Sequence, residues 1–403
     1  MERLPTEIIG QICGALCHHC RPCPDEKNLR LAATGSSRHA LLNLCLTSSR
    51  LRAIAQPVLY HHIYIWDEDE ERCTYLLHTI FARPDLGRAV RYLIIAEDAQ
   101  GKEWTGPDPG DWWRTGGADR FVQRLLVRVP RIEVLWIQPW APKTWDFLVN
   151  NRYTQSLPAL RRVHVEYNND CDLSGMTSLF SLATNIDSLA IRYCQGLSCT
   201  LSLQNVTCLI LNGCLFSPPC MRRLLSSCGK LDTFAYRDEQ FDEVVLDVLI
   251  SPYELIGLLE EQGHNFTLRR LYICCNNYKE HVRSLVSFSR LQILRLNFWT
   301  WPKTISEDLQ AEWLPPSLEE IGLCDLGRNQ QCTPEARDSW RHPSFVEWIE
   351  WISAKASSGF FPRLKKTCFS RPEAQEKFQH LKNITCLQTE NLALRDLMTR
   401  IPM

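Results

Sequence analysis

One spacing of aliphatic residues recurs through most of this 403-residue chain. An aliphatic residue is followed by two other residues, a second aliphatic, one other residue and a third aliphatic, as in Val206, Leu209 and Leu211. The alternation at the end of this phrase predicts a short strand whose aliphatic side chains point to one side. Clear copies begin at Val90, Ile132, Leu160, Ile186, Val206, Leu268, Leu291 and Leu318, and weaker copies begin at Leu231 and Leu364.

Several copies of the phrase continue to an Asn or Cys, at Asn168, Cys194, Cys214 and Asn276. The pattern L-x-x-L-x-L-x-x-N/C resembles the leucine-rich repeat signature. Such a unit cannot bury its own apolar face, so neighbouring units must stack on one another. Helical patterns precede several strands; SPYELIGLLEEQG, for example, begins at Ser-Pro and ends at Gly. We therefore expect an α/β fold in which strands line the concave side and helices the convex side of an irregular leucine-rich repeat solenoid, or horseshoe.

The segment before the repeats has helical periodicity instead. In LPTEIIGQICGAL the apolar residues fall on one stripe of a helix. A second helical stretch, RHALLNLCLTSSRLRAIAQPVLY, carries a break near Thr47 and Ser48. Such a short helical head rarely has enough core to stand alone, so its apolar residues have to pack on a neighbour.

The head resembles the F-box family. The resemblance rests on Leu4-Pro5, Glu7-Ile8-Ile9 and Ile12, and on the stretch LLNLCLTSSRLRAIAQPVLYHHI, whose form is similar to that of fungal F-box proteins. The resemblance implies that the head binds the Skp adaptor of an SCF-type E3 ubiquitin ligase and, through it, a cullin scaffold. The repeat domain would then bind an unknown protein substrate. The alternative is a leucine-rich repeat scaffold or inhibitor with no link to a ubiquitin ligase.

These patterns predict two domains. Residues 1–63 form the F-box-like helical domain, with an inserted loop at 17–39 where the family has only a short loop. Residues 64–403 form the leucine-rich repeat domain, with an insertion at 96–120 and a C-terminal cap. The long loop at 17–39 is the departure from the family pattern that bears on adaptor docking.

The head supplies the candidate adaptor-binding residues. We expect roughly half of them to enter a groove of the adaptor and the others to pack the head onto the first repeat. The candidates are Leu4, Pro5, Ile8, Ile9, Ile12, Leu44, Cys45, Leu51 and Leu59.

The strands supply the candidate substrate-binding residues, because alternation directs the residues between the aliphatics to the concave face. These residues are Trp136, His164, Glu166, Arg192, Arg237, Tyr272 and Arg295. Arginine and aromatic residues are enriched in binding hot spots, and guanidinium groups pair well with carboxylate and phosphate. The three arginines favour an acidic or phosphorylated peptide, or else they pair with nearby acids such as Asp187 and Glu320.

The composition excludes several other classes of protein. The formal net charge of −1 gives no general attraction to nucleic acid or to an anionic membrane, so we expect neither as a partner. The longest apolar runs are too short to span a bilayer. The start of the chain lacks the basic and apolar segments of a secretory signal, and many of the 19 cysteines lie within apolar runs. These features favour reduced thiols in the cytoplasm, the nucleus or both.

Candidate chemistry is sparse. Cys17, Cys20 and Cys23 have a spacing that suits zinc, and His18 and His19 lie between them, but no second ligand pair follows at the usual spacing. We therefore interpret this segment as a loop and predict no metal or other cofactor. The sequence contains neither a nucleophile elbow nor a phosphate-binding loop, which favours a protein that is not an enzyme.

Overall fold

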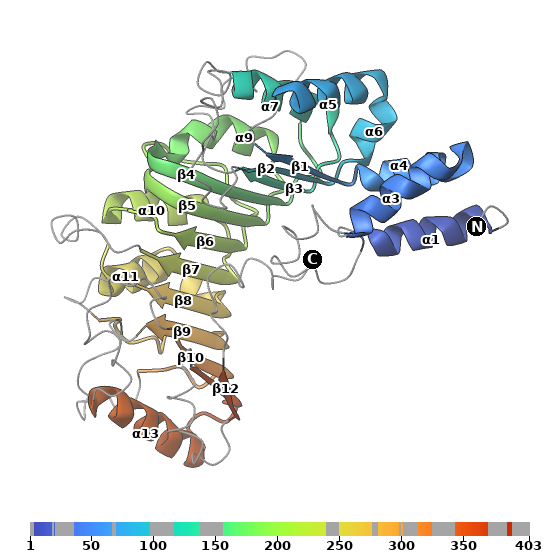
Figure 1. Cartoon of the computed structure of the whole chain (residues 1–403). Coiled ribbons are helices and arrows are strands. Elements are labelled where there is room, and N and C mark those ends of the chain that lie inside the picture. The colour runs from blue at the N-terminus through green and yellow to red at the C-terminus, as the bar shows by residue number, and fades with distance from the viewer. Residues whose placement is uncertain are drawn as a thin grey trace, which may run out of the picture. The chain divides into compact units, whose positions relative to one another are not determined.

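The computed structural model describes residues 4–17, 20, 36–66, 70–96, 117–137, 156–238, 250–275, 281–297, 300, 313–324, 343–369 and 385–388 (Figure 1). The fold mixes helices with parallel strands, as expected for the α/β class. The chain forms two compact units. Unit 1 contains Met1–Ile191, Leu201–Leu203 and Arg395–Met403, and unit 2 contains Arg192–Thr200 and Gln204–Leu394.

The head of unit 1 contains helices α1 (Thr6–Leu16), α3 (Ser36–Thr47) and α4 (Ser49–Leu59). The predicted break between the last two is confirmed at Ser48, whose side chain caps α4 by accepting a hydrogen bond from the Leu51 amide at 3.2 Å. The three helices enclose an apolar core. Its buried residues are Ile9, Cys13, Leu41, Cys45, Leu51 and Ala55.

The rest of unit 1 alternates strands with helices. In chain order these are β1 (His62–Trp66), α5 (Glu70–Ala82), α6 (Pro84–Ala89), β2 (Tyr92–Ala96), α7 (Gly117–Arg128), β3 (Val134–Ile137), β4 (Arg162–Asp172), the short 3₁₀ helix η1 (Leu173–Met176) and α9 (Thr177–Leu182). Strands β1 to β4 pair in parallel with their neighbours along the chain. Parallel neighbours need a crossover segment, and the helices between the strands lie along one side of them (Figure 1). Strand β5 (Ser188–Gly196) contains the point at which the two units divide.

Unit 2 continues the same alternation. Its elements are β6 (Cys208–Asn212), α10 (Pro218–Ser227), β7 (Thr233–Arg237), α11 (Pro252–Glu261), η3 (His264–Phe266), β8 (Arg270–Cys274), β9 (Ile293–Asn297), β10 (Glu320–Cys324), α13 (Pro343–Ser357), β11 (Lys366–Phe369) and β12 (Thr385–Gln388). Strands β6 to β12 also pair in parallel in chain order. The helix predicted before Leu268 is α11, and it starts with a full capping box between Ser251 and Glu254.

The recurring aliphatic phrase forms the core of both units, as predicted. In every copy that begins between Val90 and Leu291, all three positions are 5% exposed or less. Two of the cysteines that end a copy of the phrase make hydrogen bonds to the backbone. The Sγ atoms of Cys194 and Cys214 donate weak hydrogen bonds to the carbonyls of Gly196 and Asn212, at 3.4 and 3.7 Å.

The predicted boundaries differ from the observed elements at several points. Strand β1 begins at His62, inside the range 1–63 assigned to the head, and α3 begins at Ser36, inside the predicted loop 17–39. In the predicted insertion 96–120, Ala96 ends β2 and the residues from Gly117 begin α7, while 97–116 lie outside the described residues. Strand β12 falls within the predicted C-terminal cap. Among the described residues, no helix combines the length and apolar character needed to cross a bilayer.

Candidate functional site

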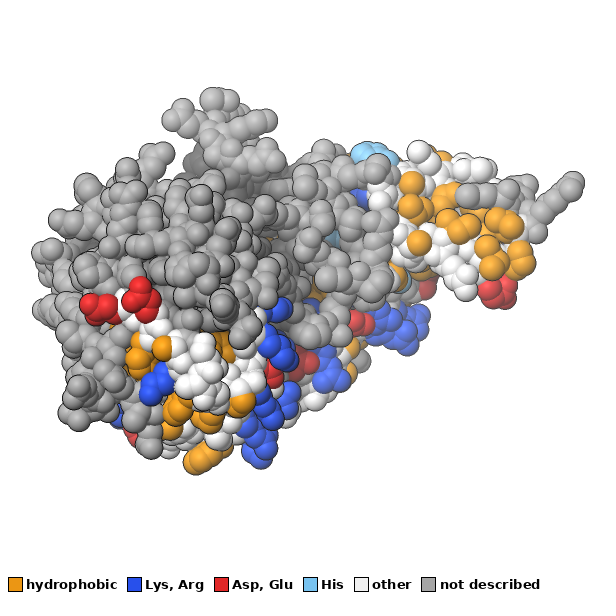
Figure 2. Space-filling model, turned by 90° about the horizontal axis from the view of Figure 1, so that it is seen from below, with side chains coloured by type: hydrophobic (Ala, Val, Ile, Leu, Met, Phe, Trp, Pro, Cys, Tyr) orange, Lys and Arg blue, Asp and Glu red, His pale blue; other side chains and the backbone are white. Residues whose placement is uncertain are grey.

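The head carries four exposed apolar side chains. Leu4, just before α1, and Ile8 in its first turn are 36% and 40% exposed, and Leu42 and Leu46 on α3 are 44% and 69% exposed. Leu42 and Leu46 are four residues apart within α3, so they lie on the same side of that helix. Figure 2 shows hydrophobic side chains gathered on the part of the surface that belongs to the head. We call these four residues the apolar face.

The predicted adaptor-binding residues fall into three groups. Leu4, Pro5 and Ile8 are exposed, and Ile12, Leu44 and Leu59 are half-buried. Ile9, Cys45 and Leu51 are at most 6% exposed and belong to the core of the head, so their side chains serve its folding rather than contact with a partner.

Leu42 and Leu46 were missed because they directly follow Leu41 and Cys45, which are buried in the core of the head. Consecutive helical residues lie about 100° apart, so a broad apolar stripe can include both neighbours, and the periodicity does not decide which one faces inward. The orientation of α3 against α1 and α4 decides it. Leu42 and Leu46 therefore join the exposed members of the predicted set.

The start of α1 is held in place by α4. The Arg50 guanidinium donates a hydrogen bond to the carbonyl oxygen of Leu4 at 2.8 Å. The Ile9 amide donates to the carbonyl of Pro5 at 3.1 Å, which begins the helical hydrogen-bond series. These hydrogen bonds fix the backbone of Leu4, a member of the apolar face, and of Pro5.

In unit 1, the predicted concave-face residues Trp136 and His164 are largely buried, at 7% and 9% exposure. They are direct neighbours in the β3–β4 register, and their rings stack with centroids 4.3 Å apart. Ile94 is the partner of Trp136 on the other side, and Tyr64 packs against both. These side chains therefore share one face of the strands, where they pack against one another. Glu166 on the same face is half-buried.

In unit 2, the alternative for Arg295 is the one observed. Its side chain lies across Gly322, where an added Cβ would come within 2.7 Å of Arg295 Cγ. The guanidinium pairs with Glu320, with Nε 3.0 Å from Oε1, and lies 5.6 Å from the centre of the Tyr272 ring. Tyr272 and Arg295 are 8% and 7% exposed. Arg295 is thus engaged within the protein rather than directed at an acidic ligand.

The other two predicted arginines are half-buried. Arg192 donates a hydrogen bond to the hydroxyl of Tyr193 at 3.0 Å and lies 4.9 Å from the centre of that ring. Tyr193 has a left-handed backbone with φ of 59°, which is uncommon for a residue other than glycine. Arg237 ends β7.

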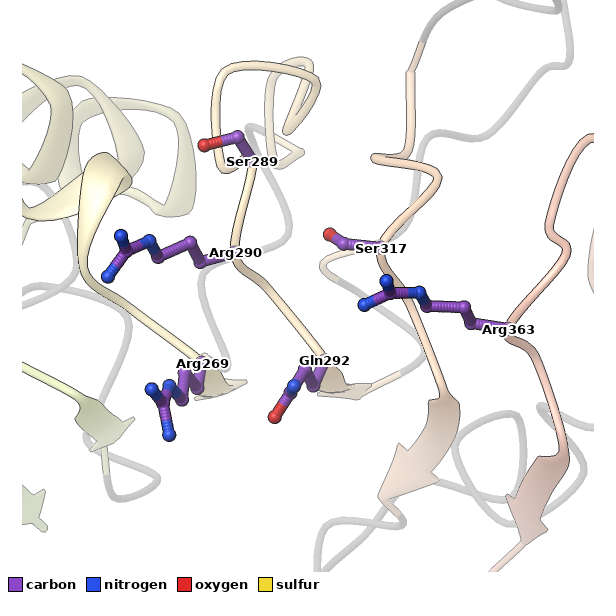
Figure 3. Close-up of a pocket in the computed structure, with 6 residues that line it drawn as sticks. All are labelled: Arg269, Ser289, Arg290, Gln292, Ser317 and Arg363. Carbon is purple, nitrogen blue, oxygen red and sulfur yellow. The ribbon is translucent and has the colours of Figure 1, made fainter.

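Unit 2 contains a pocket of about 260 Å³ lined by arginines that the alternation pattern did not indicate. The lining residues are Arg269, Ser289, Arg290, Gln292, Ser317 and Arg363. Figure 3 shows that they come from the segments that lead into strands β8, β9, β10 and β11. We call this site the arginine pocket. Its residues lie outside the repeated phrase, so the aliphatic spacing gave no signal for them.

Two ion pairs lie along the edge of the strands that carries the arginine pocket. Asp232 lies 3.4 Å from Arg269, and Glu319 pairs with Lys365 at 3.6 Å. Between these two ion pairs lies the neutral Gln292, whose amide donates to the carbonyl of Arg269. Arg290 and Arg363 are exposed. The pocket can therefore attract an anionic group.

One group of potential metal ligands lies at the end of α1. Cys17, Cys20 and His61 bring their side chains together, whereas the third predicted candidate, Cys23, lies outside the described residues. Cys17, the first residue of the predicted loop, directly follows α1 in an extended backbone conformation, and its side chain is buried at 3% exposure. His61 was missed because it is far from the cysteines in the sequence.

Comparison with models of known protein families and with curated proteins gave no match to this chain. The function is therefore inferred from the residues and surfaces described above.

Proposed function

We propose that this protein is the substrate-recognition subunit of an SCF-type E3 ubiquitin ligase. In this proposal the head is an F-box that binds the Skp adaptor and, through it, a cullin scaffold. The strands and helices that follow form an irregular leucine-rich repeat domain that binds a protein substrate, and the chain itself has no catalytic role. The cytoplasm and nucleus are the expected locations. The exposed apolar face is the observation that carries the proposal.

The apolar face is not needed to complete the fold of the head. The core is already filled by buried residues from all three helices, and Leu42 and Leu46 lie outside it. Burying a leucine side chain contributes roughly 1.5–3 kcal/mol, so a partner that covers four such residues gains a large favourable term. Helices that present residues four apart commonly dock into apolar grooves. This match supports an adaptor with a groove or helical surface as the partner.

The repeated phrase supports the second half of the proposal. Its aliphatic residues are buried in successive parallel strands, and helices such as α7, α10 and α11 follow between them. Stacked units of this kind present broad surfaces on which partners bind. The arginine pocket is the part of that surface that we assign to an acidic or phosphorylated segment of the substrate.

The adaptor test uses the full chain and a purified Skp adaptor. We expect Leu46→Asp and Ile8→Asp to weaken adaptor binding by at least roughly tenfold, since each buries a charge where the parent buries an apolar side chain. The matched control is Phe266→Asp, which changes a residue 64% exposed in unit 2. Isothermal titration calorimetry measures the affinities, and circular dichroism melts show whether each variant folds as the parent does.

Two results would contradict the adaptor proposal. A folded parent chain that does not bind the adaptor would favour the scaffold or inhibitor without a ligase link. Equal affinities for the parent, Leu46→Asp and Ile8→Asp would show that binding does not use the apolar face.

The substrate side is tested with peptides, independently of the adaptor. We expect a phosphoserine peptide rich in glutamate to bind the parent more tightly than its unphosphorylated, glutamine-substituted counterpart. Arg290→Glu and Arg363→Glu should remove this preference, whereas Arg223→Glu, on the exposed surface of α10, should retain it. Fluorescence anisotropy at two salt concentrations measures the affinities, because exposed charge interactions weaken as salt rises. If both pocket variants still bind the phosphorylated peptide more tightly than its counterpart, the assignment of the arginine pocket to an acidic or phosphorylated segment is wrong.

A further inference from the structure

Two cysteines and a histidine from distant parts of the sequence meet in unit 1. Cys17 follows the last residue of α1, Cys20 lies shortly after it, and His61 lies between α4 and β1. The Sγ atoms of Cys17 and Cys20 are 3.7 and 3.4 Å from Nδ1 of His61. The three ligand atoms all lie within 4.8 Å of one another. Neither cysteine is in a disulfide.

These separations fit a shared tetrahedral metal ion. Zinc binds sulfur at about 2.3 Å and nitrogen at about 2.0–2.1 Å, so a sulfur and a nitrogen on one tetrahedral zinc lie about 3.6 Å apart. Both sulfur–nitrogen distances in the structure are close to that value. Thiolate and imidazole ligands suit zinc, whereas calcium and magnesium require oxygen ligands.

The backbone holds two of the three ligands in place. The Cys17 amide donates to the carbonyl of Gly14 at 3.0 Å. The carbonyl oxygen of His61 accepts hydrogen bonds from the amides of Arg91 and Tyr92, both at 2.9 Å, and the His61 amide donates to Val58 at 3.1 Å. Cys17 is buried, His61 is half-buried and Cys20 is exposed. The site is therefore built on secondary structure and is open to solvent at Cys20.

A metal ion at this position offsets the mutual repulsion of two adjacent thiolates, whose protons are released to solvent when the ion binds.

We propose that Cys17, Cys20 and His61 bind a zinc ion that joins the end of α1 to the start of β1. A water molecule or another side chain of the chain takes the remaining position. The ion would fix the head to the first strand of unit 1, because one ligand comes from the α4–β1 connection and the other two from the end of α1. This site shares no residue with the apolar face or the arginine pocket, so its test does not depend on the proposed function.

The test measures metal binding directly on the full chain, purified under reducing conditions without an affinity tag. We expect stoichiometric zinc by mass spectrometry, and a cobalt titration that produces thiolate-to-cobalt charge-transfer and tetrahedral absorption bands. Cys20→Ser and His61→Gln should each weaken cobalt binding by at least roughly tenfold, because each removes one of the protein ligands. Cys199→Ser and His78→Gln are the matched controls and should bind as the parent does.

The outcomes are distinguishable from a folding defect. Cys20 is exposed, so Cys20→Ser should keep the circular dichroism spectrum of the parent even where Cys17→Ser does not. A well-folded parent with no cobalt bands overturns the proposal, as does unchanged affinity in both ligand variants. Loss of binding in Cys20→Ser but not in His61→Gln overturns the assignment of His61. In the parent, removal of zinc by a chelator should speed hydrogen exchange at the end of α1.

Discussion

The head and unit 2 use apolar side chains in opposite ways. In unit 2 the repeated aliphatic residues of the copies that begin between Val206 and Leu291 are almost completely buried, and two polar side chains buried among them donate hydrogen bonds to backbone carbonyls. The Tyr236 hydroxyl donates to the carbonyl of Cys214 at 3.2 Å, and the Asn297 amide donates to that of Cys275 at 2.7 Å. Among the described residues of the head, the buried side chains are all apolar, and the apolar face is left exposed.

The two regions differ in how completely their apolar side chains are buried within the protein. Successive strands of unit 2 cover one another, so their apolar residues contribute to folding. The head encloses a smaller core and keeps Leu42 and Leu46 outside it. These exposed leucines are the observation from which we propose a partner that covers them.

The sharpest test of this comparison truncates one leucine in each region. Leu209 in β6 is fully buried, so Leu209→Ala should lower the free energy of unfolding by about 3 kcal/mol through lost burial and a residual cavity. Leu46 is 69% exposed, so Leu46→Ala should change the free energy of unfolding by less than about 0.5 kcal/mol. Urea denaturation of the full chain, followed by circular dichroism, measures both values. Similar losses in the two variants would show that the head and unit 2 do not differ in this way.

The next largest expected effect concerns two ion pairs of unit 2, one buried and one exposed. The side chains of Arg295 and Glu320 are 8% and 14% exposed, whereas those of Arg222 and Glu261 are 51% and 50% exposed. Glu320→Ala leaves a buried guanidinium without its carboxylate and should cost about 2 kcal/mol. Glu261→Ala should cost less than about 0.5 kcal/mol, because solvent screens that pair. Urea midpoints measure the two costs, and a smaller loss for Glu320→Ala than for Glu261→Ala would refute the ranking.

The sequence predicted the strands well because their signal is local and repeated. Strand β1, HIYIW, was missed because its phrase carries Tyr60 where an aliphatic residue is expected, and β12 carries Cys386 at an aliphatic position. The candidate sites were less predictable. Each of them depends on which of two neighbouring residues faces inward, as with Leu41 and Leu42, or on segments that are distant in sequence.

The arginine pocket illustrates the second difficulty. Its residues come from segments that precede four different strands, so no spacing in the sequence connects Arg269 with Arg363. The same holds for His61, which is 41 residues from Cys20, the nearer in sequence of its two cysteine partners. Local periodicity predicts which face of an element is apolar, but only packing brings such separate segments together.

Helix capping offers a smaller and closely matched comparison. Ser48 of the head and Ser251 of unit 2 each accept a hydrogen bond from a backbone amide at 3.2 Å. Ser251 is 5% exposed and also donates its amide to Glu254 at 3.1 Å, whereas Ser48 is half-buried. We expect Ser251→Ala to cost about 1 kcal/mol and Ser48→Ala about 0.5 kcal/mol, because water can replace the cap only at Ser48. Urea denaturation measures both, and a larger cost at Ser48 would contradict the role assigned to burial.

The smallest effect is a pH dependence that arises from a buried polar group of unit 2. His264 is 2% exposed, and its Nε2 lies 3.1 Å from the carbonyl oxygen of Leu225. Burial lowers the pKa of His264, and the hydrogen bond to Leu225 opposes part of that shift. Below about pH 6.5 the unfolded chain binds a proton at His264, and the folded protein binds less than one proton there at the same pH. The contribution of His264 to stability is therefore present above that pH and is lost as the pH falls.

His264→Gln isolates this contribution, because glutamine can still donate to Leu225 but does not titrate. We expect the parent to lose more stability than His264→Gln between about pH 7.5 and about pH 5.5, a window that spans the pKa of unfolded histidine. The exposed His78 supplies the control, and His78→Gln should follow the parent more closely than His264→Gln does. Urea midpoints at the two pH values measure the difference. If His264→Gln loses as much stability as the parent, the buried imidazole is not the group that makes unit 2 sensitive to acid.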